Sequence, residues 1–167
     1  ESFSGDRERL GAFAGFLTGG GKVLSVDHHI TNTHYGDENV VEPDASSTCE
    51  VLFGLMDEEK ISRETAACLY TGIVHDTGVF QYSNTSVKTM DIAGKMMKKG
   101  IDFSTIISES YYQKTYVQNQ VLGRALMESI LLLDGKIIVG RIRQKDMDFY
   151  GVGPADLDGI VSQLRVT

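Results

Sequence analysis

The stretch that decides the fold is Lys22-Val23-Leu24-Ser25-Val26-Asp27-His28-His29-Ile30-Thr31-Asn32. It begins with a short apolar run, residues 23–26, that fits a strand, and it turns polar at Asp27, His28 and His29. A strand that ends in such side chains places them at the carboxyl edge of a sheet, where open α/β folds carry out their chemistry. Carboxylate and imidazole groups also bind divalent cations. The stretch therefore predicts a strand that ends at a metal site.

A second polar cluster, His75-Asp76-Thr77-Gly78, follows another apolar segment later in the chain. Residues 63–74 repeat apolar side chains at helical spacing, which predicts a mostly buried helix. We expect this helix to deliver Asp76 to the same site as Asp27. The turn at Thr77 and Gly78 would let the backbone come close to a ligand, because glycine carries no side chain.

Between the two clusters, Ser47 and Glu50 have the spacing of a capping box, which predicts a helix from Ser47 to about Met56. Two interpretations of this helix start remain open. In the first, the serine only caps the helix. In the second, the exposed amide groups, together with Ser46 and Ser47, face a substrate phosphate, since helix starts attract anions.

The remaining elements are predicted from caps, glycines and apolar patterns. The Asp134-Gly135 pair between two apolar runs is a strong hairpin signal. We expect a helix start within residues 6–17, a short strand over 79–82, helices over about 87–99, 103–112 and 115–129, and a hairpin over 130–142. A short helix should begin at Pro154 and run through Ile160 and Leu164 to the end.

Composition limits the partners of this chain. Its formal net charge of −7 over 167 residues argues against a surface that tracks a long nucleic acid, because neutralising many phosphates needs a basic face. A short phosphorylated substrate fits better. No apolar run approaches the roughly 20 residues of a membrane helix, and the amino terminus lacks the layout of a signal peptide. We therefore expect a cytoplasmic protein with no membrane segment.

Three segments in this order resemble the DHH phosphoesterases, and within them the nanoRNase and 3'-phosphoadenosine-5'-phosphate phosphatase branch, which is close to the cyclic-di-AMP phosphodiesterases. The segments are residues 22–32, Pro43-Asp44-Ala45-Ser46-Ser47-Thr48-Cys49-Glu50 and Gly72-Ile73-Val74-His75-Asp76-Thr77-Gly78-Val79-Phe80-Gln81-Tyr82-Ser83-Asn84-Thr85-Ser86.

The resemblance implies an α/β fold: the latter part of a parallel-sheet DHH catalytic domain with flanking helices over residues 1–114, a connecting helix over 115–129, and the beginning of a second α/β, substrate-binding domain over 130–167. By the same resemblance we expect both ends to be truncated. Upstream aspartate ligands would be missing, and this piece alone would be inactive or weak.

The resemblance also implies metal-assisted hydrolysis of a phosphate ester, with two Mn²⁺ ions in the complete enzyme and Mg²⁺ as the alternative metal. His28 and Asp76 would ligate metal, and Asp27 would orient His28. His29 would face the scissile phosphate and stabilise charge there. Asn32 would support either the loop or the substrate.

The implied substrates are short oligoribonucleotides, the nucleotide 3',5'-bisphosphate pAp, or both. The alternatives are cyclic-di-AMP or a linear dinucleotide. A different class of function also stays open, a non-catalytic module that binds metal or nucleotide. The family suggests a homodimer.

Overall fold

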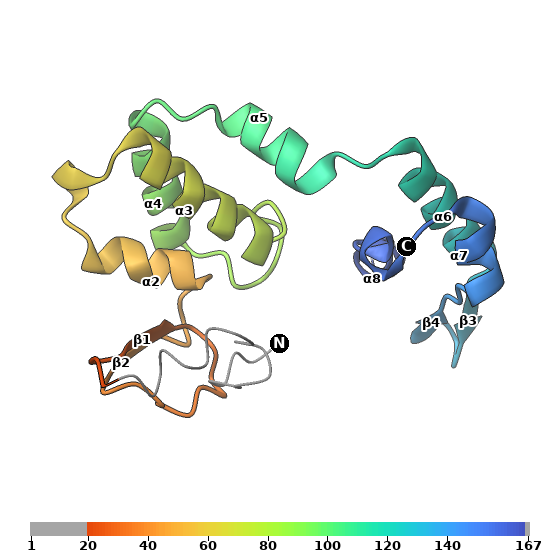
Figure 1. Cartoon of the computed structure of the whole chain (residues 1–167), viewed down its shortest axis with the longest axis horizontal. Coiled ribbons are helices and arrows are strands. Elements are labelled where there is room, and N and C mark those ends of the chain that lie inside the picture. The colour runs from red at the N-terminus through yellow and green to blue at the C-terminus, as the bar shows by residue number, and fades with distance from the viewer. Residues whose placement is uncertain (1–19, 166–167) are drawn as a thin grey trace. The chain divides into compact units, whose positions relative to one another are not determined.

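The computed structural model describes residues 20–165 (Figure 1). The helix start expected within residues 6–17 lies outside the described residues. The chain divides into two compact units, with the boundary between Tyr112 and Gln113. The first unit holds a parallel strand pair and several helices, and the second holds an antiparallel hairpin and helices. The predicted α/β class is confirmed.

The parallel pair in the first unit consists of β1 (Leu24–Asp27) and β2 (Glu38–Val41). Asp27 is the last residue of β1, so the strand ends where the sequence predicted. Its register partner is Val41, the last residue of β2. The strand β2 was not predicted, because Glu38-Asn39-Val40-Val41 is too short to show an apolar pattern.

The helices of the first unit begin at polar caps. Ser47, Ser62 and Ser86 each precede a helix and accept a hydrogen bond from the backbone amide three residues later. Such caps satisfy amides that have no partner within the helix. The predicted helices are confirmed. Their bounds are α2 (Thr48–Leu55), α3 (Arg63–Asp76), α4 (Val87–Lys98) and α5 (Phe103–Ile107), with a 3₁₀ turn η2 (Glu58–Lys60) and a π-helical segment η3 (Ser108–Tyr112).

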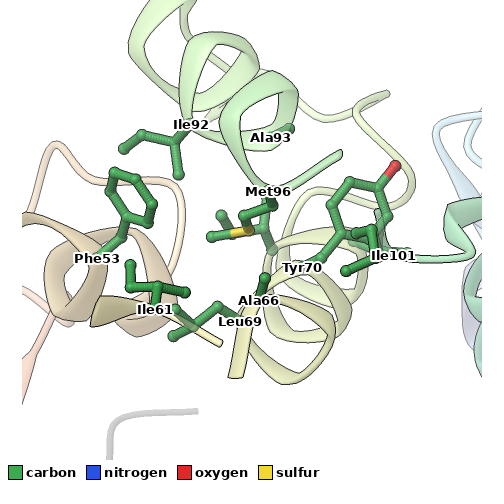
Figure 2. Packing of buried hydrophobic residues seen from close by; sticks show 11 residues of the cluster. Phe53, Ile61, Ala66, Leu69, Tyr70, Ile92, Ala93, Met96 and Ile101 are labelled. Carbon is green, nitrogen blue, oxygen red and sulfur yellow. The ribbon is translucent and has the colours of Figure 1, made fainter. Parts of the chain in front are cut away.

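The core of the first unit lies among α2, α3 and α4. Figure 2 shows Met96 of α4 among the other core side chains, including Phe53 of α2 and Tyr70 of α3. Met96 and Ile73 have no exposed surface. Burial of each such side chain stabilises the unit by about 1.5–3 kcal/mol. This packing fixes the two ends that matter for the site, the start of α2 and the end of α3.

The strand predicted over residues 79–82 is wrong. Thr77 is buried, and its carbonyl accepts hydrogen bonds from the amides of Gln81 and Tyr82, while its hydroxyl accepts one from Phe80. Val79 and Phe80 have φ of 56° and 64°, which is left-handed backbone that no strand uses. Local hydrogen bonds to Thr77 therefore wind this segment into turns.

The second unit contains the predicted hairpin, β3 (Ile130–Leu132) paired antiparallel with β4 (Ile137–Val139). The helix predicted over 115–129 is also confirmed, as α6 (Tyr116–Met127). It packs within this unit against α7 (Gln144–Tyr150), η4 (Pro154–Leu157) and α8 (Ile160–Arg165). The helix α7 was not predicted, and the single helix expected from Pro154 is wrong: Gly159, with φ of 79°, separates η4 from α8. Over residues 20–165, no helix has the length and apolar character needed to cross a membrane.

Candidate functional site

The side chain of Asp27 is the centre of a dense hydrogen-bond cluster at the end of β1. Its Oδ1 accepts from the backbone amides of His28 and His29 at 2.7 and 3.1 Å, and its Oδ2 accepts from Asn32 Nδ2 at 2.6 Å. Burial opposes ionisation of this carboxyl. The hydrogen bonds from Asn32 and His29 and the backbone amides outweigh burial and lower its pKa to about 2. Asp27 is therefore a charged, rigidly held group.

The imidazole ring that Asp27 holds belongs to His29, with Nδ1 2.7 Å from Oδ1. The prediction that Asp27 orients the ring of His28 is therefore wrong. The physical reason is that Nδ1 of His28 lies 3.1 Å from the carbonyl oxygen of Ala45, which is its partner in place of Asp27. The two rings meet edge to face, with centroids 4.5 Å apart.

The backbone contact of His28 determines the tautomer of its neutral ring. A carbonyl oxygen only accepts hydrogen bonds, so Nδ1 must carry the proton. In the neutral ring, Nε2 then carries a lone pair. Nε2 lies 3.7 Å from Oδ2 of Asp76. In this tautomer, the lone pair of Nε2 and the carboxylate of Asp76, both of which can donate electron pairs to a cation, lie close together.

Asp76 is the last residue of α3 and is half-exposed, with 48% of its side chain accessible. The buried face of α3, which includes Ile73 and Val74, anchors this end of the helix in the core. The sequence prediction that a buried helix brings Asp76 to the residues after β1 is confirmed by the 3.7 Å approach to His28.

Ser46 and Ser47 are both completely buried, and their hydroxyls already have partners within the chain. Ser46 Oγ donates to Glu50 Oε2 at 2.6 Å, and Ser47 Oγ accepts from the Glu50 amide at 3.1 Å. Capping by Ser47 is confirmed. The capping box is incomplete, because the Glu50 carboxylate bonds to Ser46 and not to the Ser47 amide. A substrate contact by either serine stays a prediction.

Asn32 is buried, and both ends of its carboxamide are used within the loop. Nδ2 donates to Asp27, and Oδ1 accepts from the His34 amide at 2.7 Å. The loop-supporting role expected for Asn32 fits these bonds, while a substrate contact stays a prediction.

Asn84 has a role that the sequence analysis did not assign to it. Nδ2 donates to the carbonyl oxygens of Ser46 and Asp76, at 3.0 and 3.1 Å. It therefore ties the end of α3 to the segment before α2. No local pattern reveals such a bond, because Ser46 is 38 residues away in the chain.

The imidazole of His28 and the carboxylate of Asp76 are groups of the kind that bind hard divalent cations. Two atoms that bind one ion at about 2.1 Å each are at most about 4 Å apart, and the pair of His28 Nε2 and Asp76 Oδ2 meets that limit. Within residues 20–165, no group of three or more His, Cys, Asp or Glu side chains is arranged to hold a metal. The described residues thus offer part of a coordination shell.

Comparison with known proteins finds sequence similarity to one family and to several of its named proteins. The DHH family, N-terminal domain, matches residues 12–73. The chain is 39% identical over 89 residues to the "Probable bifunctional oligoribonuclease and PAP phosphatase NrnA" of Streptococcus mutans. The aligned residues make up 52% of this chain and 29% of that protein. It is 27% identical over 150 residues to the bifunctional oligoribonuclease and PAP phosphatase NrnA of Bacillus subtilis, covering 87% of this chain and 47% of that protein.

A solved structure shares the fold. The crystal structure of an exopolyphosphatase-related protein from Bacteroides fragilis matches with a TM-score of 0.87 at 22% identity, over 96% of this chain and 48% of that one. The chain thus spans about half or less of the length of these relatives. The matched residues include Asp27, His28 and His29. Residues 12–73 thus match the N-terminal domain of the DHH family, and the chain is similar in sequence to proteins named as bifunctional oligoribonucleases and PAP phosphatases.

Proposed function

We propose that this chain is part of a metal-dependent phosphoesterase that hydrolyses short oligoribonucleotides, the bisphosphate pAp, or both. The observation that carries the proposal is the pair formed by His28 Nε2 and Asp76 Oδ2, 3.7 Å apart, with the other nitrogen of His28 held by a backbone carbonyl. The names of the NrnA relatives, which state oligoribonuclease and PAP phosphatase activities, support the substrate class.

We propose His28 and Asp76 as ligands of Mn²⁺, with Mg²⁺ as the alternative. Two such ions would polarise the phosphate and supply a hydroxide nucleophile at neutral pH. The Ala45 carbonyl fixes the ring of His28, which is the usual outer contact of a metal-bound imidazole. We place the remaining ligands outside residues 20–165, because the described residues supply only part of a shell.

His29 and Asp27 have the proposed catalytic roles. The bond between Asp27 Oδ1 and His29 Nδ1 fixes the orientation of the ring. We propose that His29, in its protonated form, donates Nε2–H to a phosphate oxygen and stabilises the negative charge that develops on it. Asn32, Ser46 and Ser47 would keep the adjoining loops in place, and a contact of any of them with substrate stays a prediction.

The second candidate within this chemistry is hydrolysis of cyclic-di-AMP or a linear dinucleotide. The net charge of −7 supports small substrates in general over a long nucleic acid. A module that binds metal or nucleotide without turnover is the alternative of another class. It is supported by the incomplete set of ligands in residues 20–165. A homodimer and a cytoplasmic location complete the proposal.

The test is an assay of this chain, alone and within its full gene product, with and without Mn²⁺. The substrates are 5'-phosphorylated dinucleotides, pAp, linear and cyclic di-AMP, and pyrophosphate. We expect Mn²⁺-dependent release of mononucleotides from dinucleotides, or of phosphate from pAp, by the full product and little by this chain alone. Mn²⁺ binding without turnover of any substrate would favour the binding module and overturn the enzyme.

A further inference from the structure

Glu50 carries a buried carboxylate that the proposed chemistry does not use. The residue is 1% exposed, and its Oε2 accepts from Ser46 Oγ at 2.6 Å, from the Ser46 amide at 3.3 Å and from Thr89 Oγ1 at 2.7 Å. Nζ of Lys88 lies 3.7 Å from the other oxygen. The carboxylate thus joins the segment before α2 to the first turn of α4.

These contacts are not those of an ordinary helix cap. In a capping box, a glutamate at this position reaches back to the amide of the cap residue, here Ser47. Glu50 instead reaches past the cap to Ser46 and across to Thr89. Burial opposes ionisation of Glu50, but the bonds from Ser46 and Thr89 and the charge of Lys88 outweigh it and lower its pKa. An ionised carboxylate only accepts hydrogen bonds. The groups around Glu50, the amide and hydroxyl of Ser46 and the hydroxyl of Thr89, all donate to it.

The segment that Glu50 holds leads directly to the site. Ser46 follows Ala45, whose carbonyl oxygen lies 3.1 Å from Nδ1 of His28. The carbonyl of Ser46 itself accepts from Asn84, which also donates to the backbone of Asp76. Residues 45 and 46 therefore contact His28 on one side and, through Asn84, the end of α3 on the other.

We propose that Glu50 is a positioning residue: by holding Ser46, it fixes the Ala45 carbonyl against Nδ1 of His28 and so keeps Nε2 turned toward Asp76. The proposal rests on the proposed function for the role of His28 as a ligand. The positioning itself is a property of the chain without metal and is measurable there.

The test follows the ring of His28 by two-dimensional ¹⁵N NMR of the metal-free chain. The spectra are recorded at a pH where the ring is neutral. In the wild type we expect the Nδ1–H tautomer, because Ala45 offers only an acceptor. In Ser46→Ala and Glu50→Ala we expect a share of the Nε2–H tautomer to appear, with a smaller share in Glu50→Gln, which keeps one acceptor oxygen.

Thr89→Val is the matched control, because it removes one donor to the same carboxylate and leaves Ser46 bonded to it. A purely structural role would make this variant disturb His28 as much as Ser46→Ala does, and that result would overturn the proposal. An unchanged His28 ring in folded Ser46→Ala and Glu50→Gln would overturn it as well. These two variants decide the matter if Glu50→Ala does not fold.

A second arm measures Mn²⁺ binding to the same proteins by calorimetry, without any substrate. If the wild-type chain binds Mn²⁺, we expect Glu50→Ala to bind it about 10- to 100-fold more weakly, the usual effect of losing an outer contact of a metal ligand. If the full gene product binds no Mn²⁺ while the tautomer of His28 still changes in the Glu50 variants, that result would overturn the proposed function and support the positioning role of Glu50. If all variants bind Mn²⁺ equally and the His28 ring is unchanged in each, the positioning role of Glu50 would be overturned and the proposed function supported.

Discussion

The side-chain amide of Asn32 donates a 2.6 Å hydrogen bond to Asp27, and both residues are buried. This bond occupies the one oxygen of Asp27 that does not contact the two histidines. The stability of the loop after β1 is therefore coupled to the orientation of the Asp27 carboxylate.

Asn32→Ala tests this coupling. The substitution leaves a buried carboxylate oxygen without its donor, which costs about 1–3 kcal/mol in the free energy of unfolding. Asn32→Asp should cost more at neutral pH, because it places a second carboxylate beside the first. Urea unfolding followed by circular dichroism measures both. The control is the exposed Asn119, where Asn119→Ala should change stability by at most about 0.5 kcal/mol. An equal, small effect at both positions would show that the bond carries no stability.

Substitution of the proposed metal ligands should separate metal binding from folding. His28→Ala or Asp76→Ala in the full gene product should abolish Mn²⁺-dependent turnover, because each removes a proposed ligand. Asp76 is half-exposed, so its replacement should leave the free energy of unfolding nearly unchanged. Turnover with the substrate panel and Mn²⁺ titration by calorimetry are the measurements. Full activity in either variant would eliminate the proposed site.

His29→Ala should behave differently from those two variants. Its ring is held by Asp27 and is proposed to contact substrate and not metal. Turnover should therefore fall by roughly 10²–10³, the loss expected when one donor to a developing charge is removed, while Mn²⁺ affinity stays near that of the wild type. Equal losses of affinity and turnover would instead identify His29 as a ligand.

Sequence alone predicted the parts of this protein that depend on local pattern. Caps such as Ser47 and Ser86 fixed the helix starts, and the apolar run before Asp27 fixed β1. The grouping of Asp27, His28 and Asp76 followed from two apolar segments that each end in groups suited to a divalent cation, and from the resemblance to the DHH phosphoesterases.

The errors arose where specific hydrogen bonds decide the structure, some of them local and some between residues distant in the chain. Thr77 winds residues 79–82 into turns through bonds that an apolar pattern does not reveal. The Ala45 carbonyl, 17 residues away, takes the nitrogen of His28 that was expected to face Asp27. The spacing between Ser47 and Glu50 predicted a capping box. The contact of Glu50 with Thr89 had no sequence signal, because Thr89 lies 39 residues later.

Close packing between α2 and α3 leads to a prediction at Gly72. A Cβ added at this position would overlap Sγ of Cys49. Gly72→Ala gains about 1 kcal/mol of helix propensity, but overpacking of a close contact costs about 1–3 kcal/mol. We expect a net loss of stability in urea unfolding. Gly54, where an added Cβ meets nothing, is the matched helical control, and Gly54→Ala should stabilise the protein.

The double variant Gly72→Ala with Cys49→Ala tests the physical cause. Removing the sulfur clears the overlap, so the loss from Gly72→Ala should shrink or reverse in that background. Simple addition of the two single effects would mean that the loss arises elsewhere in α3.

The lowered pKa of Glu50 predicts how stability depends on pH. A carboxyl whose folded pKa lies below its ordinary value of 4.5 stabilises the folded state above that pH, and the contribution is lost as pH falls through the folded value. In Glu50→Gln this contribution is absent at every pH. The difference in unfolding free energy between wild type and Glu50→Gln should therefore be constant near neutrality and narrow below 4.5. Urea unfolding at a series of pH values measures it, with Glu59→Gln as the exposed control. A difference that grows as pH falls would mean that burial dominates, and that Glu50 binds its proton more readily in the folded chain than in the unfolded one.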